Sequence, residues 1–452
     1  MVLNCLATSA NHKAREYNKF QNLELKLLKL LFYLYSMQFR FYCFLFLMSF
    51  SLSGQNISQS KISRMIDKIE AFDQAHIAVH IESINSRRTK VEYAGDDFMT
   101  PASNIKLFTF LAALESLDSL PALYFHKQDS IMHFKATGYP LLFHPFYPDP
   151  RLESFFNQKY DWRYHCPIFK NNALGKGWSW DDHSHYFAAE STPFPIYGNT
   201  TMAYGTSTST TLLPKVFKNQ VSIDKNVKNI LRDPKKNQFL INPNFFETKD
   251  TLYRPFVTSD SLFVKLLSDH INQPVSLEWS KESPKWKVLF THQDQLVYQA
   301  LIKDSDNGVA EALMNMISQK IFGVMDTKRT TDSLKLKWNS WLPDPLEWVD
   351  GSGMSRYNMT TPRTLVSVLK KIHDQIGLEK IKNYFPESIR ADKKVYAKTG
   401  TLRHNHNLSG YWIGKKGQVF AFSIMVNHYI RPKNEISKGI IDLLEFFQKK
   451  VR

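Results

Sequence analysis

The sequence is poor in cysteine. It has three cysteines in 452 residues, and two of them, Cys5 and Cys43, lie in an N-terminal segment that we expect to be removed. Cys166 would then be alone, and a single cysteine forms neither an internal disulfide nor a cysteine-rich metal site. Since no neighbouring sequence marks Cys166 as activated, we expect it to be a packing residue.

Repeats, low-complexity tracts and nucleic-acid-binding signatures are also absent. There is no zinc-finger spacing and no arginine-rich run, which argues against nucleic acid as a partner. The formal net charge is +16, which suits either an ordinary basic soluble protein or one attracted to an anionic partner such as a cell-wall polymer or a membrane surface. The length of 452 residues allows two or three domains.

The N-terminal stretch "MQFRFYCFLFLMSFSLSGQ" (37–55) predicts an export signal. One arginine precedes an apolar run of about a dozen residues, shorter than the roughly 20 that span a bilayer, and small residues at 51–54 offer a cleavage site. We therefore interpret 1–54 as a mis-assigned start followed by a signal peptide (37–54). The expected protein is exported, periplasmic or otherwise extracytoplasmic, without a stable membrane span; an uncleaved anchor is the alternative.

Hydrophobic periodicity predicts helices and strands that alternate along the chain. A helix is expected at 61–72 and two strands within 76–96, and short, aromatic-rich segments from about 120 to 285 predict a mainly β insertion. The remaining predicted elements are two helical runs flanking "SDN" (291–322), a helix at 361–376, a strand at 393–402, a hairpin at 408–430 and a closing helix at 433–450. This order predicts an α+β fold in which strands from both chain ends pair in one antiparallel sheet.

One serine–lysine pair stands out in "TPASNIKLFTF" (100–110). Thr100 suits the N-cap of a helix and Pro101 its first position, so Ser103 would lie in the first turn and Lys106 one turn further on the same face. The spacing alone is not specific, because it recurs at Ser58/Lys61, Ser222/Lys225 and Ser367/Lys370.

Two further motifs give this pair its meaning. "SNIK" (103–106), "SDN" (305–307) and "KTGT" (398–401) are each weak, since a first-turn serine, a turn or a solvated strand end explains each one. Together and in this order they are typical of penicillin-binding proteins and serine β-lactamases.

The residue types suit acyl transfer. The hydroxyl of Ser103 becomes a good nucleophile only when a base takes its proton, and a helix N-terminus favours developing negative charge. Lys106 can act as that base only when neutral, so its pKa must fall from about 10.4. Burial and a second cation, which Lys398 could supply, both lower it.

The other motif residues suit supporting roles. The hydroxyl of Ser305 could relay a proton to the leaving amine, and the amide of Asn307 could hold Lys106 and a substrate carbonyl. Gly400 would let the substrate lie flat along its strand, and the backbone N–H groups of the nucleophile and of Thr401 could form an oxyanion hole.

No metal or cofactor is expected. His404 and His406 follow the KTGT motif, but no acidic third ligand lies near them in sequence. "DGSGMS" (350–355) lacks the G-x-S-x-G spacing of a serine triad.

Four stretches resemble one known family: "MTPASNIKLFTFLAALESL" (99–117), "GWSWDD" with "FAAE" (177–190), "DGSGMSRYNMTTP" (350–362) and "KTGTL…LSGYW" (398–412). They are similar to the serine-type D-alanyl-D-alanine carboxypeptidase/endopeptidase family, the class C low-molecular-mass penicillin-binding proteins. The resemblance runs from about 60 to 450 and is weakest in the middle.

The resemblance implies a transpeptidase-like domain, an antiparallel sheet packed with helices, formed by 55–120 and 286–452 with an insertion at 121–285. It implies a carboxypeptidase that acts on peptidoglycan stem peptides and is inhibited by β-lactams, and it leaves open whether the enzyme also cuts cross-links. Ser103 would be the acylated nucleophile and Lys106 the base. Lys398 and Thr399 would bind the substrate carboxylate.

Two other functions stay open. A β-lactamase-like hydrolase shares the three motifs, although the long insertion and the DGSG stretch disfavour it. A non-catalytic cell-wall-binding protein could keep the fold, but the intact motifs argue against it. Substrate preference is open, because Gly308, 136–143 and 403–407 depart from the usual family pattern.

The export signal leads to the first prediction. N-terminal sequencing of the mature protein should find a start just after the 37–54 segment, because signal peptidase cleaves at small residues. A mature form that begins upstream of Met37, or that only detergent extracts, would contradict it.

Overall fold

The structure is a computed structural model. It describes residues 57–85, 89–206, 210–247, 251–278, 285–390, 392–414 and 417–451. The predicted signal peptide (37–54) lies outside these residues. The chain from Ile57 onward forms one compact unit, and no helix in its described part has the length and apolar character needed to cross a membrane.

Six antiparallel strands form the central sheet, in the spatial order β14 (Glu387–Arg390), β15 (Lys393–Leu402), β16 (Asn405–Ile413), β17 (Val419–Asn427), β1 (His76–Ser83) and β2 (Thr89–Tyr93). β1 pairs with β17, with His76 opposite Asn427 and Ser83 opposite Phe420. The prediction that strands from both chain ends share one antiparallel sheet is therefore confirmed.

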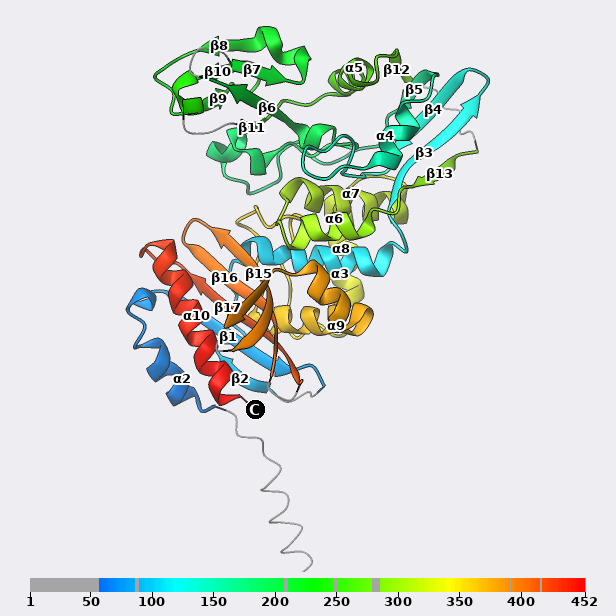
Figure 1. Cartoon of the computed structure of the whole chain (residues 1–452). Coiled ribbons are helices and arrows are strands. Elements are labelled where there is room, and N and C mark those ends of the chain that lie inside the picture. The colour runs from blue at the N-terminus through cyan, green and yellow to red at the C-terminus, as the bar shows by residue number, and fades with distance from the viewer. Residues whose placement is uncertain are drawn as a thin grey trace, which may run out of the picture. The chain divides into compact units, whose positions relative to one another are not determined.

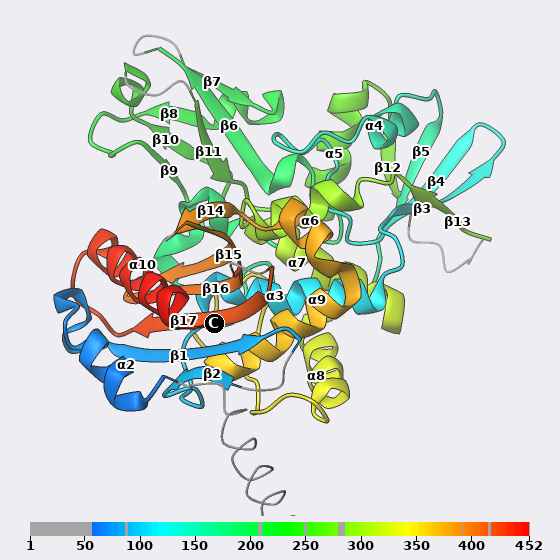
Figure 2. The ribbon, with the colours of Figure 1, turned by 60° about the horizontal axis from the view of Figure 1, so that its bottom comes forward.

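Helices cover both faces of this sheet (Figures 1 and 2). One face carries α2 (Gln59–Ile66) and α10 (Lys433–Lys450); the other carries α3 (Lys106–Ser116) and α9 (Pro362–Tyr384), with α6 (Asp294–Ile302), α7 (Asn307–Phe322) and α8 (Thr327–Trp338) beyond them. The closing helix is amphipathic: Ile436, Ile440, Leu443 and Phe447 recur at helical spacing and are buried against the sheet. The helix expected over 61–72 is divided into α2 and a short 3-10 turn.

The segment that carries Ser103 differs from the expected helix start. A 3-10 turn, η2 (Ala102–Ile105), leads directly into α3, and no side chain caps it. The prediction of Thr100 as N-cap is therefore wrong. Instead, the Thr100 carbonyl accepts hydrogen bonds from the side-chain amides of Asn407 (2.9 Å) and Asn427 (3.1 Å), so two strands of the sheet hold the start of the turn.

The region between β3 (Pro121–Gln128) and β13 (Lys287–Phe290) contains mostly strands. These two strands pair, with Pro121 opposite Phe290, so the chain leaves and returns at one place. Three sheets belong here: β12 (Val275–Glu278)-β5 (Asp161–His165)-β4 (Ile131–Ala136)-β3-β13, β11 (Thr251–Pro255)-β6 (Thr200–Gly205)-β7 (Thr210–Leu213), and β8 (Val221–Ile223)-β10 (Phe239–Ile241)-β9 (Ile230–Arg232). In the described part of this region, the helices α4 (Pro150–Phe156) and α5 (Asp260–Ile271) accompany these sheets.

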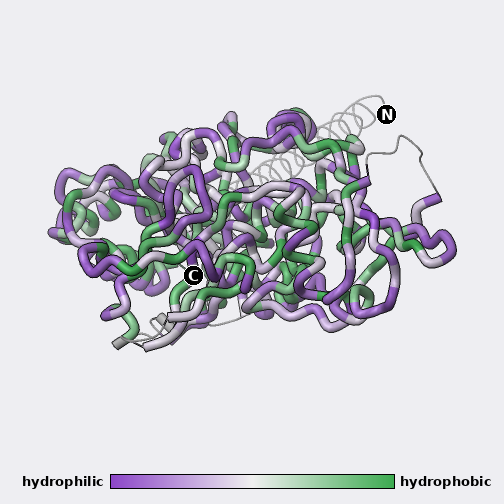
Figure 3. The backbone as a smooth tube through the Cα atoms, turned by 90° about the horizontal axis from the view of Figure 1, so that it is seen from above, coloured by the Kyte–Doolittle hydropathy of each residue, from purple (hydrophilic) through white to green (hydrophobic). Residues whose placement is uncertain are grey.

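The remaining elements are short 3-10 turns: η1 (Glu70–Phe72), η3 (Trp180–Ser184), η4 (Tyr186–Ala188), η5 (Tyr197–Asn199), η6 (Lys215–Gln220) and η7 (Pro243–Glu247). Figure 3 shows hydrophobic segments running through the unit and many hydrophilic loops at its edges. The architecture confirms the predicted α+β class with a mainly β inserted region.

Candidate active site

The three predicted motifs meet at one place. Lys106 Nζ lies 3.1 Å from Ser103 Oγ and 2.5 Å from Asn307 Oδ1, although Lys106 and Asn307 are 201 residues apart in sequence. Lys398 Nζ lies 2.7 Å from Ser305 Oγ. The fold thus brings together all five residues for which catalytic roles are predicted.

The structure also shows why one other pair with the same spacing, Ser367 and Lys370, forms no such site. The Ser367 hydroxyl donates to the Arg363 carbonyl one turn back in α9 (3.0 Å). Lys370 forms an ion pair with Glu82 on β1, with 2.5 Å between Nζ and Oε2. This serine and this lysine each have another partner, whereas Ser103 and Lys106 face each other.

Lys106 is fully buried. The groups that contact its nitrogen decide in which direction the lone pair of the neutral amine can point. Apart from Ser103, its ammonium nitrogen contacts two carbonyl oxygens, Asn307 Oδ1 and Ser352 O at 2.6 Å. Carbonyl oxygens only accept hydrogen bonds. A neutral amine at this position would donate to both carbonyls and accept from the Ser103 hydroxyl, which is the arrangement that a general base needs.

Burial lowers the pKa of Lys106 to about 8, while the charges of Asp350, Asp306 and Glu311 oppose the shift. The predicted fall toward neutrality is therefore present. Its largest cause is the removal of the ammonium from water.

Lys398 is buried as deeply and lies beside the first lysine. Its Nζ donates to Ser305 Oγ and to the Thr399 carbonyl, both at 2.7 Å. Burial lowers the pKa of Lys398 well below its usual range, and the positive charge of Lys106 lowers it further. Since Lys106 has three carboxylates in its surroundings, it is the better placed of the two lysines to hold a proton while the site contains no substrate.

Two glycines let neighbouring segments approach the nucleophile. A Cβ at Gly400 would lie 2.3 Å from the Pro101 carbonyl oxygen, and one at Gly353 would lie 2.0 Å from the Ala102 carbonyl oxygen. The missing side chain of Gly400 therefore makes room for the turn that carries Ser103, and not for substrate as the sequence had suggested. The small size of Gly400 lets β15 pack alongside this turn. The predicted oxyanion hole requires this closeness, because its two N–H groups come from the turn and from β15.

Sequence reasoning missed a pair of buried carboxylates behind Lys106. Asp350 accepts hydrogen bonds from the backbone N–H groups of Gly353 (2.9 Å) and Ser355 (2.7 Å), from Asn358 Nδ2 (2.7 Å) and from Trp178 Nε1 (2.8 Å). It therefore ties the DGSG loop to the GWSW stretch. An aspartate directly before a glycine-rich turn is a recognisable signal for such a loop-organising role.

Glu311 on α7 is the second of these carboxylates. Its Oε1 accepts from the Ser352 N–H at 2.8 Å, and Lys106 donates to the carbonyl of that same residue. Burial, followed by the charge of Asp350, raises the pKa of Glu311 to about 7. The hydrophobic periodicity of the sequence does not predict that this glutamate is buried, because a charged residue inside a helix normally faces water.

The remaining motif residues occupy the edge of the site. Thr399 and Thr401 are exposed on β15, and Thr401 Oγ1 lies 2.8 Å from His406 Nδ1. Burial lowers the pKa of His406 to about 4, so the ring is neutral. Asp306, to which the sequence analysis gave no role, accepts from the Val309 N–H at 2.9 Å and caps α7.

Two other expectations concern metals and Cys166. Across the described ranges, no group of three or more His, Cys, Asp or Glu side chains is arranged to hold a metal ion. Cys166 is half-buried, and burial together with Asp260 raises the pKa of its thiol to about 12. At neutral pH the thiol stays protonated, which makes it a poor nucleophile.

Comparison with known proteins adds independent information. The model of the D-Ala-D-Ala carboxypeptidase 3 (S13) family matches residues 58–121 and 288–449, together half of the chain. The interruption of this match begins within β3 and ends at the first residue of β13. A curated relative, the D-alanyl-D-alanine carboxypeptidase DacB of Haemophilus influenzae, is 22% identical over 464 residues, which cover 89% of this chain and 95% of that protein.

Solved structures share the fold. Penicillin-binding protein 4 (dacB) from Haemophilus influenzae superposes with a TM-score of 0.67 at 19% identity, covering 86% of this chain and 98% of that one. The same protein complexed with a novel β-lactam gives a TM-score of 0.63 at 18% identity with the same coverage. The chain therefore belongs to the D-Ala-D-Ala carboxypeptidase 3 (S13) family of serine peptidases.

Proposed function

We propose that this serine-type D-Ala-D-Ala carboxypeptidase cleaves the terminal bond of peptidoglycan stem peptides through an acyl-enzyme on Ser103. The observation that carries the proposal is the setting of Lys106, whose two other polar partners are carbonyl oxygens, so that its neutral form can accept a proton only from Ser103. Family membership supports the reaction class.

In the proposed reaction, Lys106 takes the Ser103 proton as the serine oxygen attacks the carbonyl carbon of the penultimate D-alanine. The negative charge that develops on the carbonyl oxygen would be held by the backbone N–H groups of Ser103 and Thr401. As the peptide bond breaks, the Ser305 hydroxyl gives its proton to the leaving amine and regains one from Lys106, which becomes neutral again. Water then attacks the acyl-enzyme and gives a proton to Lys106, and Lys106 passes it to Ser103 Oγ as the acyl bond breaks and the peptide leaves with a new carboxylate.

The substrate carboxylate would help to set the charges of the two lysines. Its binding at Lys398 and Thr399 would stabilise an ammonium on Lys398, which repels a second positive charge nearby. The proton on Lys106 would become easier to lose when substrate arrives. This links recognition of the peptide terminus to activation of the base.

The substrate also sets the expected location. Stem peptides lie outside the cytoplasm, so this function requires export, in agreement with the proposed signal peptide. A β-lactam would acylate Ser103 in the same way and inhibit the enzyme. Rapid steady-state turnover of nitrocefin would instead favour the β-lactamase-like alternative.

The second prediction tests the nucleophile. Fluorescent penicillin should label the purified protein, and Ser103→Ala should lose the label because no acyl bond can form. The matched controls Ser58→Ala and Ser367→Ala, which change serines with the same S-x-x-K spacing, should keep it. Labelling of Ser103→Ala at the wild-type level would refute the assignment, and mass spectrometry of digested muropeptides should show loss of terminal D-alanine.

The third prediction separates the lysines. A charge-assisted hydrogen bond contributes about 1.5–3 kcal/mol, which corresponds to roughly 10- to 150-fold in binding. Lys398→Ala should therefore lose most of the preference for a peptide ending in a free carboxylate over its amide, whereas Lys106→Ala should abolish acylation for both. Acylation rates of matched acid and amide substrates measure this. If Lys398→Ala kept the full preference for the free carboxylate over the amide, another residue would have to bind the carboxylate. Arg403 would be the next candidate.

The fourth prediction concerns pH. Acylation should increase with pH through a midpoint near the Lys106 pKa of about 8, because only the neutral amine accepts a proton. The Glu311 carboxylate stabilises the ammonium form, so Glu311→Gln should lower the pKa of Lys106 and move the midpoint to lower pH. The surface control Glu379→Gln, which loses only an exposed pair with Lys382, should not move it. A midpoint in Glu311→Gln that stays in place or rises would contradict this role.

A further inference from the structure

A buried histidine lies directly behind the strand that carries the KTGT motif. His406 on β16 is opposite Thr401 on β15, and only 7% of its surface is exposed. Its Nδ1 lies 2.8 Å from Thr401 Oγ1, and its Nε2 lies 2.9 Å from Ser437 Oγ on α10. The ring thus joins a hydroxyl of the closing helix to a hydroxyl at the edge of the active site, and the proposed reaction does not use this connection.

The ring is neutral, and this couples its two contacts. Burial, followed by the positive charge of Lys433, lowers the pKa of His406 to about 4. A neutral imidazole has one N–H, so one ring nitrogen donates a hydrogen bond and the other accepts one. If Nδ1 donates to Thr401, Nε2 accepts from Ser437; if Nδ1 accepts the Thr401 proton, Nε2 donates to Ser437. The tautomer therefore decides where the hydroxyl proton of Thr401 points.

A carboxylate beside Thr401 favours one of these two tautomers. A carboxylate only accepts hydrogen bonds, so it needs the Thr401 hydroxyl as a donor. That hydroxyl keeps its proton free for the carboxylate when it accepts from the Nδ1–H group, which leaves Nε2 to accept from Ser437. All three hydrogen bonds then run in one direction, from Ser437 through the ring to the carboxylate, and bonds in such a chain strengthen one another.

Adjacent residues of β16 hold two sides of the active site. Side chains alternate between the faces of a strand, so His406 and Asn407 point to opposite faces of the sheet. Asn407 donates to the Thr100 and Pro101 carbonyls, both at 2.9 Å, and so holds the turn that carries the nucleophile. His406 contacts the KTGT strand from the other face. The 403–407 stretch, which departs from the usual family pattern, therefore supports both the turn and the strand.

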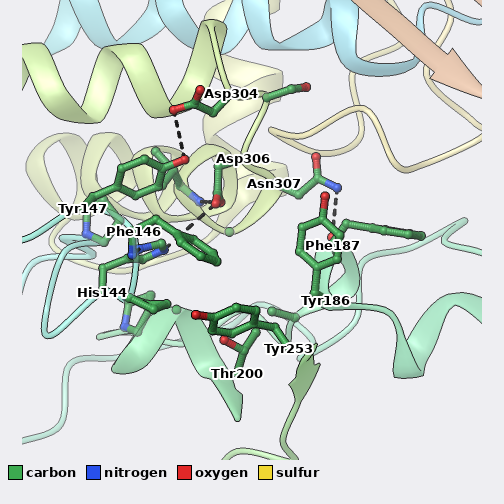
Figure 4. Close-up of a pocket in the computed structure, with 18 of the residues that line it drawn as sticks. His144, Phe146, Tyr147, Tyr186, Phe187, Thr200, Tyr253, Asp304, Asp306 and Asn307 are labelled. Atoms are coloured by element: carbon green, nitrogen blue, oxygen red, sulfur yellow. Dashed lines mark hydrogen bonds and ion pairs between the residues drawn. The ribbon is translucent and has the colours of Figure 1, made fainter. Parts of the chain in front are cut away.

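The pocket beside the SDN segment is unsuitable for a carboxylate (Figure 4). This pocket has a volume of about 400 Å³, and Phe146 and Tyr186 of the inserted region are among its aromatic walls. Its described lining includes no Lys or Arg but three carboxylates, Glu190, Asp304 and Asp306. These charges would repel the negatively charged end of a peptide. The terminal carboxylate is therefore expected on the β15 side, where the proposed function places it, at Lys398 and Thr399.

The edge of β15 beside Thr401 is open among the described strands. β14 pairs with β15 only from Lys393 to Tyr396, and Thr399 and Thr401 further along are exposed. These two threonines are two residues apart, so their side chains lie on the same face of the strand. An extended peptide that pairs with this edge would have both hydroxyls beside it. Thr401 can thus add a second hydroxyl to the group that binds the carboxylate.

We propose that His406, held by Ser437, is a positioning residue that turns the hydroxyl proton of Thr401 toward the terminal carboxylate of the substrate. The histidine does not touch the substrate and acts only through Thr401. The inference rests on the proposed function, which places the carboxylate at Lys398 and Thr399. Its consequence is a stronger preference for peptides that end in a free carboxylate.

The first arm of the test measures acylation by matched acid and amide substrates. The quantity compared is the ratio of the two rates, so that a loss common to both substrates cancels. Thr401→Val removes the hydroxyl at nearly constant volume and should lower the acid-to-amide ratio about tenfold, as expected for the loss of a hydrogen bond to a charged group. His406→Leu should lower the ratio less, roughly threefold, because the Thr401 hydroxyl remains but loses its fixed orientation. A wild-type ratio in His406→Leu would overturn the proposal.

The second arm separates positioning from a general effect on the structure. In the double variant that combines Thr401→Val with His406→Leu, the ratio should equal that of Thr401→Val alone, because no hydroxyl remains to be oriented. A further fall in the double variant would mean that His406 acts through another group, which contradicts the proposal. His406→Asn, whose amide N–H can replace the Nδ1–H group, should keep most of the wild-type ratio.

Ser437 and His404 provide further variants. Ser437→Ala keeps the ring but removes the donor to Nε2, so the ratio should fall, by less than in His406→Leu. If His406→Leu does not fold, Ser437→Ala takes its place, and an unchanged ratio there overturns the proposal. The control His404→Asn changes an exposed histidine that donates to the Tyr429 carbonyl at 2.8 Å, and it should leave the ratio unchanged. A fall in His404→Asn as large as that in His406→Leu would count against a specific role of His406.

The outcomes separate this inference from the proposed function. If the wild-type enzyme is acylated and prefers the acid, but His406→Leu and Ser437→Ala keep its ratio, the positioning role is wrong and the proposed function stands. If the wild-type enzyme is acylated without a preference for the acid, the inference fails while acyl transfer at Ser103 stands. If neither substrate acylates the wild-type enzyme, the proposed function fails and the inference fails with it.

Discussion

The burial of two lysine side chains in one small site is the constraint on which the rest of the site depends. Lys106 and Lys398 are each at most 1% exposed, and an ammonium removed from water is costly unless it is paired. Three carboxylates, Asp350, Asp306 and Glu311, stabilise the charged form of Lys106, whereas Lys398 is affected by the positive charge of Lys106. This asymmetry decides which lysine keeps a proton when no substrate is bound. It also allows the carboxylate of an arriving substrate to change which lysine is protonated.

Close backbone approach is the second requirement, and it depends on the sheet. Asn407 and Asn427, on adjacent strands, both donate to the Thr100 carbonyl, while Gly353 and Gly400 leave room for the turn to pack. Ala102, directly before the nucleophile, has a φ of 50°, which is uncommon for a residue with a side chain. The turn holds this conformation because two strands and the DGSG loop fix it from different sides.

The inserted region takes part in the site. The Asn307 side-chain amide donates to the Phe187 carbonyl at 2.9 Å while its oxygen accepts from Lys106. The amide of Asn171 likewise donates to Asn315 on α7 at 2.6 Å. Helix α7 is therefore held from the core by packing and from the insertion by hydrogen bonds, so the insertion positions one of the three motifs and supplies aromatic walls beside it.

The sequence by itself determined the α+β class, the strand pairing between chain ends and the group of residues that meet around Lys106. Hydrophobic periodicity and the order of short motifs can both be recognised along the chain without knowledge of the fold. Only the tertiary structure decided in which S-x-x-K pair the serine and the lysine lie within hydrogen-bond distance of each other, why position 400 requires a glycine, and that Glu311 and Asp350 lie behind Lys106. These features depend on burial and on contacts between residues far apart in the chain. Spacing does not encode such contacts, and the pKa values of the lysines follow from them.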